Sequence, residues 1–266
     1  MLSASITSAV VLGAGFAYWH KKSNTYRLNH QASQRNLILG FGENTLKLSK
    51  AMALDALAKQ SQLLWVVDTV SFGAGFVDLA QSVSRDQAKR LTQVELSPET
   101  SFDVLQAQVK RPDVFEKSLA IDLDLNSPTQ CALLVTLLLT LGETLLAAKH
   151  MPNYLLLLNH YDFYRTPALD NMIMALATHT TGFRIGITLA TEAIGGLSAY
   201  ANLCDHIHVL DGSWNDTLLP NEQLTNPQIV ASAENQRIKK GQLRYLSNTA
   251  TQGEVFELPR SSFFRV

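Results

Sequence analysis

The residues most suited to binding a phosphate group follow a short apolar run at residues 37–39. From residue 40 the chain reads GFGENTLKLS, so glycines stand at Gly40 and Gly42. In phosphate-binding loops of the pattern GxxxxGK(S/T), the glycines let backbone N–H groups wrap the phosphates, and the lysine reaches the terminal phosphate. Counting from Gly40 places Thr45 where the second glycine belongs and Leu46 where the lysine belongs. In this register the loop has neither residue.

A second register starts at Gly42 and fits little better. It places Lys47 at the second glycine, Leu48 at the lysine and Ser49 at the hydroxyl, so only the hydroxyl agrees. Glu43 would also bring a carboxylate toward the phosphates. The sequence therefore predicts a nucleotide loop that keeps its position and has lost its chemistry, with degenerate positions at Gly40, Gly42, Asn44, Thr45 and Lys47.

These residues lie where a predicted strand is followed by a predicted helix. Continuous apolar runs of strand length are typical of strands that are buried on both faces of a parallel sheet. Such runs occupy residues 37–39, 63–68, 118–123, 154–158, 184–189 and 206–210, with further strand candidates at 93–96 and 254–258. Helices are predicted from residue 44 or 45 and at 78–90, 129–149, 167–179, 193–201 and 227–240. This alternation predicts an α/β domain with a predominantly parallel sheet and flanking helices.

The longest predicted helix, residues 129–149, is also apolar enough to suggest a membrane span. Gly142, Glu143 and three threonines interrupt its apolar residues. Because transmembrane helices need about 20 predominantly apolar residues, and because this helix lies between two predicted strands, we interpret it as a buried crossover helix.

The order of elements over residues 119–210 resembles the HerA/FtsK class of P-loop ATPases, and most of all the ATPases of type IV secretion and conjugation systems. In that family a strand ending in Asp-Glu precedes a helix, a Gly-x-x-x-Gly approach to a strand, and a Thr-Gln pair. The matching positions in this chain are Asn159-His160, Gly182 and Gly186, and Thr191-Glu192. The resemblance implies a RecA-like P-loop NTPase fold and partners among the other subunits of a secretion or conjugation machine, as for a coupling protein or translocation ATPase.

Several residues depart from the family pattern. The family's metal-associated aspartate falls on Asn159, its catalytic glutamate on His160 and its sensor glutamine on Glu192. Mg²⁺ prefers carboxylate oxygens, and an Asn–His pair supplies neither a negative charge nor a strong base. The position from which an arginine would approach a neighbour's nucleotide falls on His179 or a threonine. We therefore expect a non-catalytic relative with no bound cofactor.

An alternative reading keeps the enzyme activity. In that reading, displaced residues bind ATP and Mg²⁺ and hydrolyse the nucleotide: Lys47 replaces the missing lysine, and Asp162 supplies a carboxylate if its loop bends back. A third possibility is a module that binds nucleotide without hydrolysing it. On the preferred reading, the side chains of Phe41, Leu46 and Tyr161 fill the vacant site or contact a partner, and partners bind nearby.

No other cluster predicts a metal site or a second chemistry. His206 and His208 alternate on a predicted strand but have no third ligand nearby, and zinc needs three or four. Asp122 and Asp124 are interpreted as a turn-forming pair. The 22 basic and 23 acidic residues give a net charge of −1, which argues against a large basic face. Direct binding of nucleic acid is therefore not expected.

The first residues of the chain differ from the rest. Residues 2–19 carry no charge, end in a Tyr-Trp pair and are followed by two lysines. Aromatic residues suit the membrane interface, and a positive flank favours the cytoplasmic side. We predict an N-terminal apolar anchor helix at residues 1–22, single-pass in the inner membrane, with the domain of residues 23–266 facing the cytoplasm. The alternative is an apolar helix that packs on the domain.

Overall fold

The computed structural model describes most of the predicted α/β core. The described residues are 34–40, 43–59, 61–68, 85–89, 91–95, 103, 118–147, 153–179, 185–192, 197–210, 242–247 and 254–257. The predicted anchor helix and the predicted helix at 227–240 lie outside these residues.

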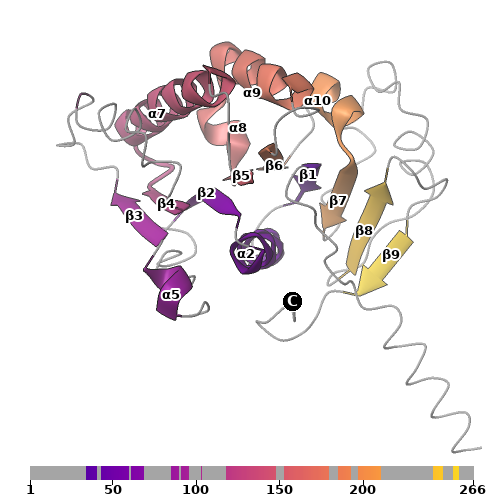
Figure 1. Cartoon of the computed structure of the whole chain (residues 1–266). Coiled ribbons are helices and arrows are strands. Elements are labelled where there is room, and N and C mark those ends of the chain that lie inside the picture. The colour runs from indigo at the N-terminus through magenta and orange to yellow at the C-terminus, as the bar shows by residue number, and fades with distance from the viewer. Residues whose placement is uncertain are drawn as a thin grey trace, which may run out of the picture.

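The described strands form one nine-stranded sheet in the order β3-β4-β2-β5-β6-β1-β7-β8-β9 (Figure 1). Neighbours from β3 through β7 pair in parallel, whereas β8 pairs antiparallel with both β7 and β9. The predominantly parallel sheet predicted from the sequence is confirmed. The strand bounds are β1 Arg35–Leu39, β2 Gln62–Asp68, β3 Leu91–Glu95, β4 Ser118–Leu123, β5 Tyr154–Leu158, β6 Ile185–Thr191, β7 His206–Leu210, β8 Gln242–Ser247 and β9 Glu254–Glu257.

Helices cover both faces of the sheet (Figure 1). One face carries α2 (Glu43–Ala58), which connects β1 to β2. The other face carries α7 (Pro128–Ala147), α8 (Tyr161–Tyr164), α9 (Pro167–His179) and α10 (Ser198–Leu203). The short helix α5 (Arg85–Ala88) precedes β3.

The central strand β5 contributes to a hydrophobic core on each face. Leu156 and Leu158 belong to the core with α7 and α9, whereas Leu155 and Leu157 belong to the core with α2. Side chains of a strand alternate between the two faces of the sheet, so a strand covered on both sides must be apolar throughout. This requirement explains the uninterrupted leucine run of β5.

The long apolar helix α7 is the crossover between β4 and β5 that the sequence predicted. It is the one helix among the described residues with the length and hydropathy for a membrane span, and 44% of its most apolar window is buried within the protein. Its threonines Thr136, Thr140 and Thr144 each donate a hydroxyl hydrogen bond to the carbonyl four residues earlier. Their hydroxyl groups are therefore satisfied within the helix itself.

Two elements of the described fold were not predicted as such. Strand β8 was not expected, and residues 161–164 were interpreted as part of a polar crossover rather than as helix α8. A four-residue helix is too short to show a helical period. The predicted element at 193–201 is described only as α10, which begins at Ser198.

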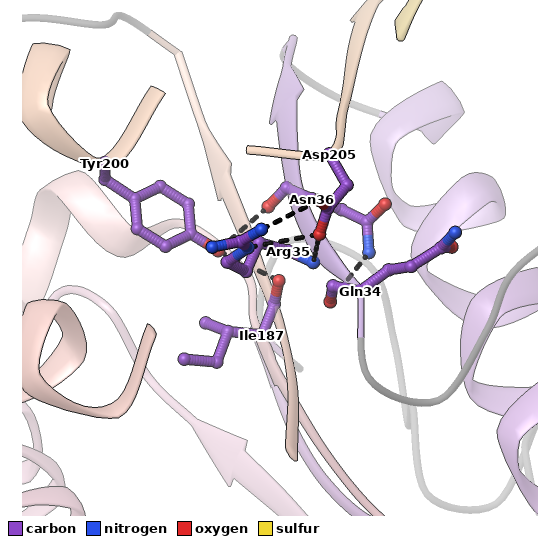
Figure 2. Close-up of polar contacts among 6 residues, drawn as sticks. All are labelled: Gln34, Arg35, Asn36, Ile187, Tyr200 and Asp205. Atoms are coloured by element: carbon purple, nitrogen blue, oxygen red, sulfur yellow. Dashed lines mark hydrogen bonds and ion pairs between the residues drawn. The ribbon is translucent and has the colours of Figure 1, made fainter. Parts of the chain in front are cut away.

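At the amino end of β1, polar contacts join three neighbouring elements (Figure 2). Arg35 makes a two-pronged ion pair with Asp205, with Nη2–Oδ1 at 2.9 Å and Nε–Oδ2 at 3.1 Å. The backbone N–H of Arg35 also donates to Asp205 Oδ2 at 2.9 Å. The Tyr200 hydroxyl donates to the carbonyls of Ile187 and Asn36, at 2.9 and 3.3 Å. These contacts fix α10 and the turn before β7 against β1 and β6.

Helices α7 and α9 approach each other closely at Gly142. A methyl group on Gly142 would lie 2.2 Å from Met172 Sδ and 2.5 Å from Met172 Cγ. We expect Gly142→Ala to lower the free energy of unfolding by about 1 kcal/mol, because crowding of this kind outweighs the gain in helix propensity. In a Met172→Ala background, the same substitution should instead raise stability. Urea unfolding of the four proteins measures this cycle, and a loss that persists without Met172 would contradict it.

The ion pair of Arg35 and Asp205 gives stability a pH dependence. Burial would raise the pKa of Asp205, but the hydrogen bonds and charge of Arg35 outweigh burial and lower it below its ordinary value. A lowered carboxyl pKa stabilises the fold above the ordinary aspartate pKa and ceases to do so as pH falls through the folded-state pKa.

We therefore expect Asp205→Asn to lower the free energy of unfolding by about 1–3 kcal/mol at neutral pH. The difference from the native chain should shrink as pH falls below the ordinary aspartate pKa and through the lowered folded-state pKa, where the native carboxylate also becomes protonated. Urea unfolding over a series of pH values measures it, with Asp86→Asn in the exposed Lys89–Asp86 pair as the control. A difference that is independent of pH would show that the charge of Asp205 is not responsible.

Candidate functional site

The candidate site lies at the edge of the sheet where parallel strands end. The carboxyl ends of β1, β6 and β5 are neighbours there, and α2 begins after β1. The N–H of Gly40 donates to the carbonyl of Thr191 at 3.0 Å, which joins the ends of β1 and β6. Ligands of open α/β sheets bind at this kind of edge.

Gly40 is a glycine because the chain is crowded at this point. A methyl group on Gly40 would lie 2.8 Å from Leu210 Cβ and 2.9 Å from Thr45 Oγ1. The close approach of β1, β7 and α2 therefore accounts for this residue without any phosphate. Gly42 lies outside the described residues.

The loop between β1 and α2 is short. Strand β1 ends at Leu39 and α2 begins at Glu43, so only residues 40–42 connect them. The pattern GxxxxGK(S/T) places four residues between its glycines, and these wrap the phosphates before the helix is established. Asn44 and Lys47, two of the predicted loop positions, lie within α2, where both are half-buried.

Ser49 is the residue of α2 that faces the end of β5. It is fully buried, and its hydroxyl donates to Asn159 Oδ1 at 2.6 Å. In the register counted from Gly42, Ser49 stands at the hydroxyl position of the loop. Its partner Asn159 stands at the position of the family's metal-associated aspartate. Leu48, at the lysine position of that register, is fully buried in the core with α2. A lysine there would have to place its ammonium group in an apolar core.

After Asn159 the chain turns sharply. His160 has φ 52° and ψ 40°, a left-handed conformation that is uncommon for a residue with a side chain. Its ring makes an edge contact with Phe163, with ring centroids 6.0 Å apart. Phe163 is 54% exposed. The position of the family's catalytic glutamate is thus a turn residue packed beside an exposed aromatic ring.

The two tyrosines of α8 anchor this turn. The Tyr164 hydroxyl donates to the carbonyl of Asn159 at 2.8 Å. The Tyr161 hydroxyl donates to Asp170, which also pairs with Arg165 at 2.8 Å. Tyr161 is fully buried in the core with α7 and α9, where burial raises its pKa above the ordinary range. The expectation that Tyr161 fills the site after β1 is therefore wrong. Phe41 lies outside the described residues.

Asp162, the candidate for a displaced carboxylate, is bonded to the end of β6. Its Oδ2 accepts hydrogen bonds from the Thr191 hydroxyl and from the N–H of Glu192, the latter at 2.8 Å. Burial, and then the charge of Asp162, raise the pKa of Glu192, the sensor-like residue. The described hydrogen bonds of Asp162 thus tie α8 to β6 and do not reach Ser49 or Asn159.

The residues of this site do not suit Mg²⁺. Mg²⁺ takes hard oxygen ligands and is usually held by at least one carboxylate. Between Ser49 and Asn159 there is only a neutral hydrogen bond, and the nearby carboxylate is engaged elsewhere. No group of three or more His, Cys, Asp or Glu residues that could hold a metal occurs within the described ranges.

The other candidate residues lie in turns or near other edges. Asp124 Oδ1 accepts a hydrogen bond from the N–H of Asn126 at 2.9 Å, as a turn-forming aspartate does. His206 begins β7, and burial lowers its pKa. His179 is the last residue of α9, which precedes β6 along the chain. Its Nδ1 lies 2.8 Å from the carbonyl oxygen of Ala175.

Sequence reasoning did not identify one feature of the site. Thr45 Oγ1 and Asn159 Nδ2 are buried and have no hydrogen-bond partner within the described structure. Thr45 and Ser49 are four residues apart on α2 and so share a helix face. That spacing was visible in the sequence, but the pairing of Ser49 with Asn159, across 110 residues, was not.

No protein-family model matches the sequence, and no curated protein sequence matches it either. Solved structures do resemble the fold. The genome packaging NTPase B204 from Sulfolobus turreted icosahedral virus 2, in complex with sulfate, has a TM-score of 0.55 and 11% identity, covering 86% of this chain and 98% of that one. The same protein in complex with AMPPCP has a TM-score of 0.52 and 11% identity, covering 87% and 100%. Identity this low shows a likeness of fold alone: the chain shares the parallel α/β fold of these NTPase structures.

Proposed function

We propose that the chain is a non-catalytic, ATPase-like component of a membrane-associated assembly. The observation that carries this proposal is the buried hydrogen bond between Ser49 and Asn159. It occupies the place where an ATPase of this fold would have a hydroxyl and a carboxylate on a metal ion.

Phosphoryl transfer depends on charge stabilisation and on the positioning of the attacking water. The lysine position is an apolar leucine in either register, Leu46 or Leu48, and both leucines belong to or pack against the core with α2. The glutamate position is His160, in a left-handed turn. The remaining carboxylate, Asp162, is bonded to Thr191 and Glu192. Each substitution removes a different element of the chemistry, so restoring any single one would not restore turnover.

The assembly we propose is a type IV secretion or conjugation machine. The order of strand ends, glycines and the Thr191-Glu192 pair supports this, because it resembles the ATPases of those systems. The fold likeness to a protein named as a genome packaging NTPase supports an ATPase-like ancestry. In this role the chain serves as a scaffold or accessory subunit, its partners are other subunits of the machine, and it needs no contact with nucleic acid.

The membrane association proposed here rests on the N-terminal segment. Residues 2–19 carry no charge and are followed by two lysines, which favours an inner-membrane anchor with the domain in the cytoplasm.

The purified chain should not hydrolyse ATP above background in the presence of Mg²⁺. The reason is the joint loss at Leu46, Asn159 and His160. Phosphate release measures this, with Lys47→Ala as the matched variant. Magnesium-dependent turnover that disappears in Lys47→Ala would overturn the proposal and favour an ATPase with displaced residues.

The full-length chain should stay with the membrane fraction in high salt and be released by detergent. An apolar segment is held by the hydrophobic effect, which salt does not weaken, whereas salt screens electrostatic attachment. Membrane fractionation measures this, with the chain shortened to residues 23–266 as the control. Release of the full-length chain by salt alone would mean that the segment packs on the domain.

A further inference from the structure

The outer surface of the neighbouring helices α7 and α9 is almost free of charge (Figure 1). The two helices have 20 and 13 residues, but apart from His179 their only ionisable acids or bases are Glu143 and Asp170. Asp170 is half-buried and pairs with Arg165, so Glu143 is the one exposed carboxylate on either helix. Charged residues ordinarily make up about 25–35% of a soluble surface. A face with so few charges is typical of the central part of a protein interface.

Helix α7 presents a continuous stripe along this surface. The stripe consists of Ala132, Thr136, Leu139, Glu143 and Leu146, which are exposed or half-buried and recur at spacings of three and four. The opposite side of the helix lies in the core with α9. The stripe is therefore the outward face of α7, and a single charged residue interrupts its small and apolar side chains.

The hydroxyl groups on this surface are already bonded within their own helices. Thr136 donates to the carbonyl of Ala132 at 2.8 Å. On α9, the Thr178 hydroxyl lies 3.0 Å from the carbonyls of both Met174 and Ala175. Covering a polar group is costly when it loses its hydrogen-bond partner. Because these hydroxyl groups keep theirs, this surface can be covered at little cost.

The composition of the two helices favours a protein partner over a lipid surface. Neither helix contains a lysine, arginine, tryptophan, tyrosine or phenylalanine. Helices that lie on a bilayer are held there by aromatic side chains at the interface and by basic side chains that attract anionic lipids. The surface of α7 and α9 has neither kind of residue, so we take its partner to be a protein.

The stripe of α7 is complementary to itself. When two copies of the helix, residues 128–147, are aligned end to end and antiparallel, Glu143 lies opposite Ala132 of the second copy. In the same alignment Leu139 lies opposite Thr136 of the second copy, so each larger side chain meets a smaller one. The two Glu143 carboxylates are then about 16 Å apart along the helix, beyond the about 8–10 Å over which exposed charges interact in physiological salt. A parallel alignment would instead place the two carboxylates opposite each other.

We propose that a second copy of the chain docks on this face and forms a two-fold dimer through antiparallel α7 helices, flanked by α9. Closed two-fold dimers are the commonest oligomers of soluble proteins. Helix α7 is about 30 Å long and the helix pair is about 20 Å wide, so the two copies together would bury roughly 1,200 Å². That area is at the lower end of the range for stable specific interfaces. The dimer is independent of the non-catalytic function, because Ser49 and Asn159 meet at α2, on the other face of the sheet.

The test is sedimentation velocity of the full chain in mild detergent over a range of protein concentrations. We expect an equilibrium between monomer and dimer. Ala132→Glu places a carboxylate opposite Glu143 of the second copy, so it should lower the dimer affinity roughly tenfold or more, whereas Ala132→Lys should raise it. Ala132 is exposed, and glutamate and lysine are both good helix formers, so neither change should disturb the fold.

A charge exchange makes the test specific to the antiparallel alignment. The double variant Ala132→Glu with Glu143→Lys should restore the dimer, because opposite charges then meet across the two-fold axis. Within one chain the two positions are eleven residues apart, too far for a pair along the helix, so the restoration cannot arise inside the monomer. Ala58→Glu, at the exposed end of α2 on the other face of the sheet, is the matched control and should leave the affinity unchanged.

Two results would overturn the proposal. One is a dimer whose affinity is the same in Ala132→Glu and Ala132→Lys, because the copies would then meet elsewhere. The other is a chain that stays monomeric at every concentration. The mass of bound detergent would then identify what covers the face: lipid if Ala132→Glu lowers that mass, and a different protein if the mass is unchanged. Neither result bears on the non-catalytic function, which phosphate release measures.

Discussion

The structure depends on the burial of β5 on both faces. Because α2 covers one face and α7 and α9 the other, each side chain of the strand lies in a hydrophobic core. Polar residues can therefore appear only where the strand leaves the sheet, and the first of them is Asn159. Strands β1 and β6 also hold a buried polar pair, in which the Asn36 side chain donates to the Thr188 hydroxyl. The ends of these two strands are joined by the bond from Gly40 to Thr191. The burial of β5 on both faces thus places the polar residues of the candidate site at the carboxyl end of the strand, whatever chemistry they perform.

The departures from the ATPase pattern are physically consistent with one another. A carboxylate at position 159 would be almost fully buried, and a buried charge without a partner is strongly destabilising. In an active site a lysine and a metal ion would offset that charge. Here Leu48 lies in the apolar core, so neither partner is supplied by α2. Asparagine keeps the shape and the hydrogen bond to Ser49 without requiring a cation. Without the cationic residue a buried carboxylate at position 159 would be destabilising, so the loss of the lysine accounts for the loss of the aspartate.

The sequence predicted most of the described elements because burial on both faces leaves a strong signal. The bounds of β5 and α9 were predicted as they are found, from a leucine run and from a proline that begins a periodic helix. Strand β8, with the sequence QLRYLS, was missed because it mixes polar and apolar residues and lacks the continuous apolar run that guided the prediction. The site residues Asn159, Asp162 and Glu192 were named from their order along the chain. Their partners depend on contacts between distant segments, and order alone cannot reveal these.

Helix α8 shows how such a site can persist without catalysis. Its tyrosines bond to Asn159 and Asp170, and its aspartate bonds to Thr191 and Glu192. Three residues of α8 thus tie the ends of β5 and β6 to α9. In an enzyme, polar groups at this edge are held ready for a substrate. Here most of them are satisfied by one another, so the edge is stable without a ligand. The unpaired atoms of Thr45 and Asn159 are the exception, and they lie on the side of the site that faces α2.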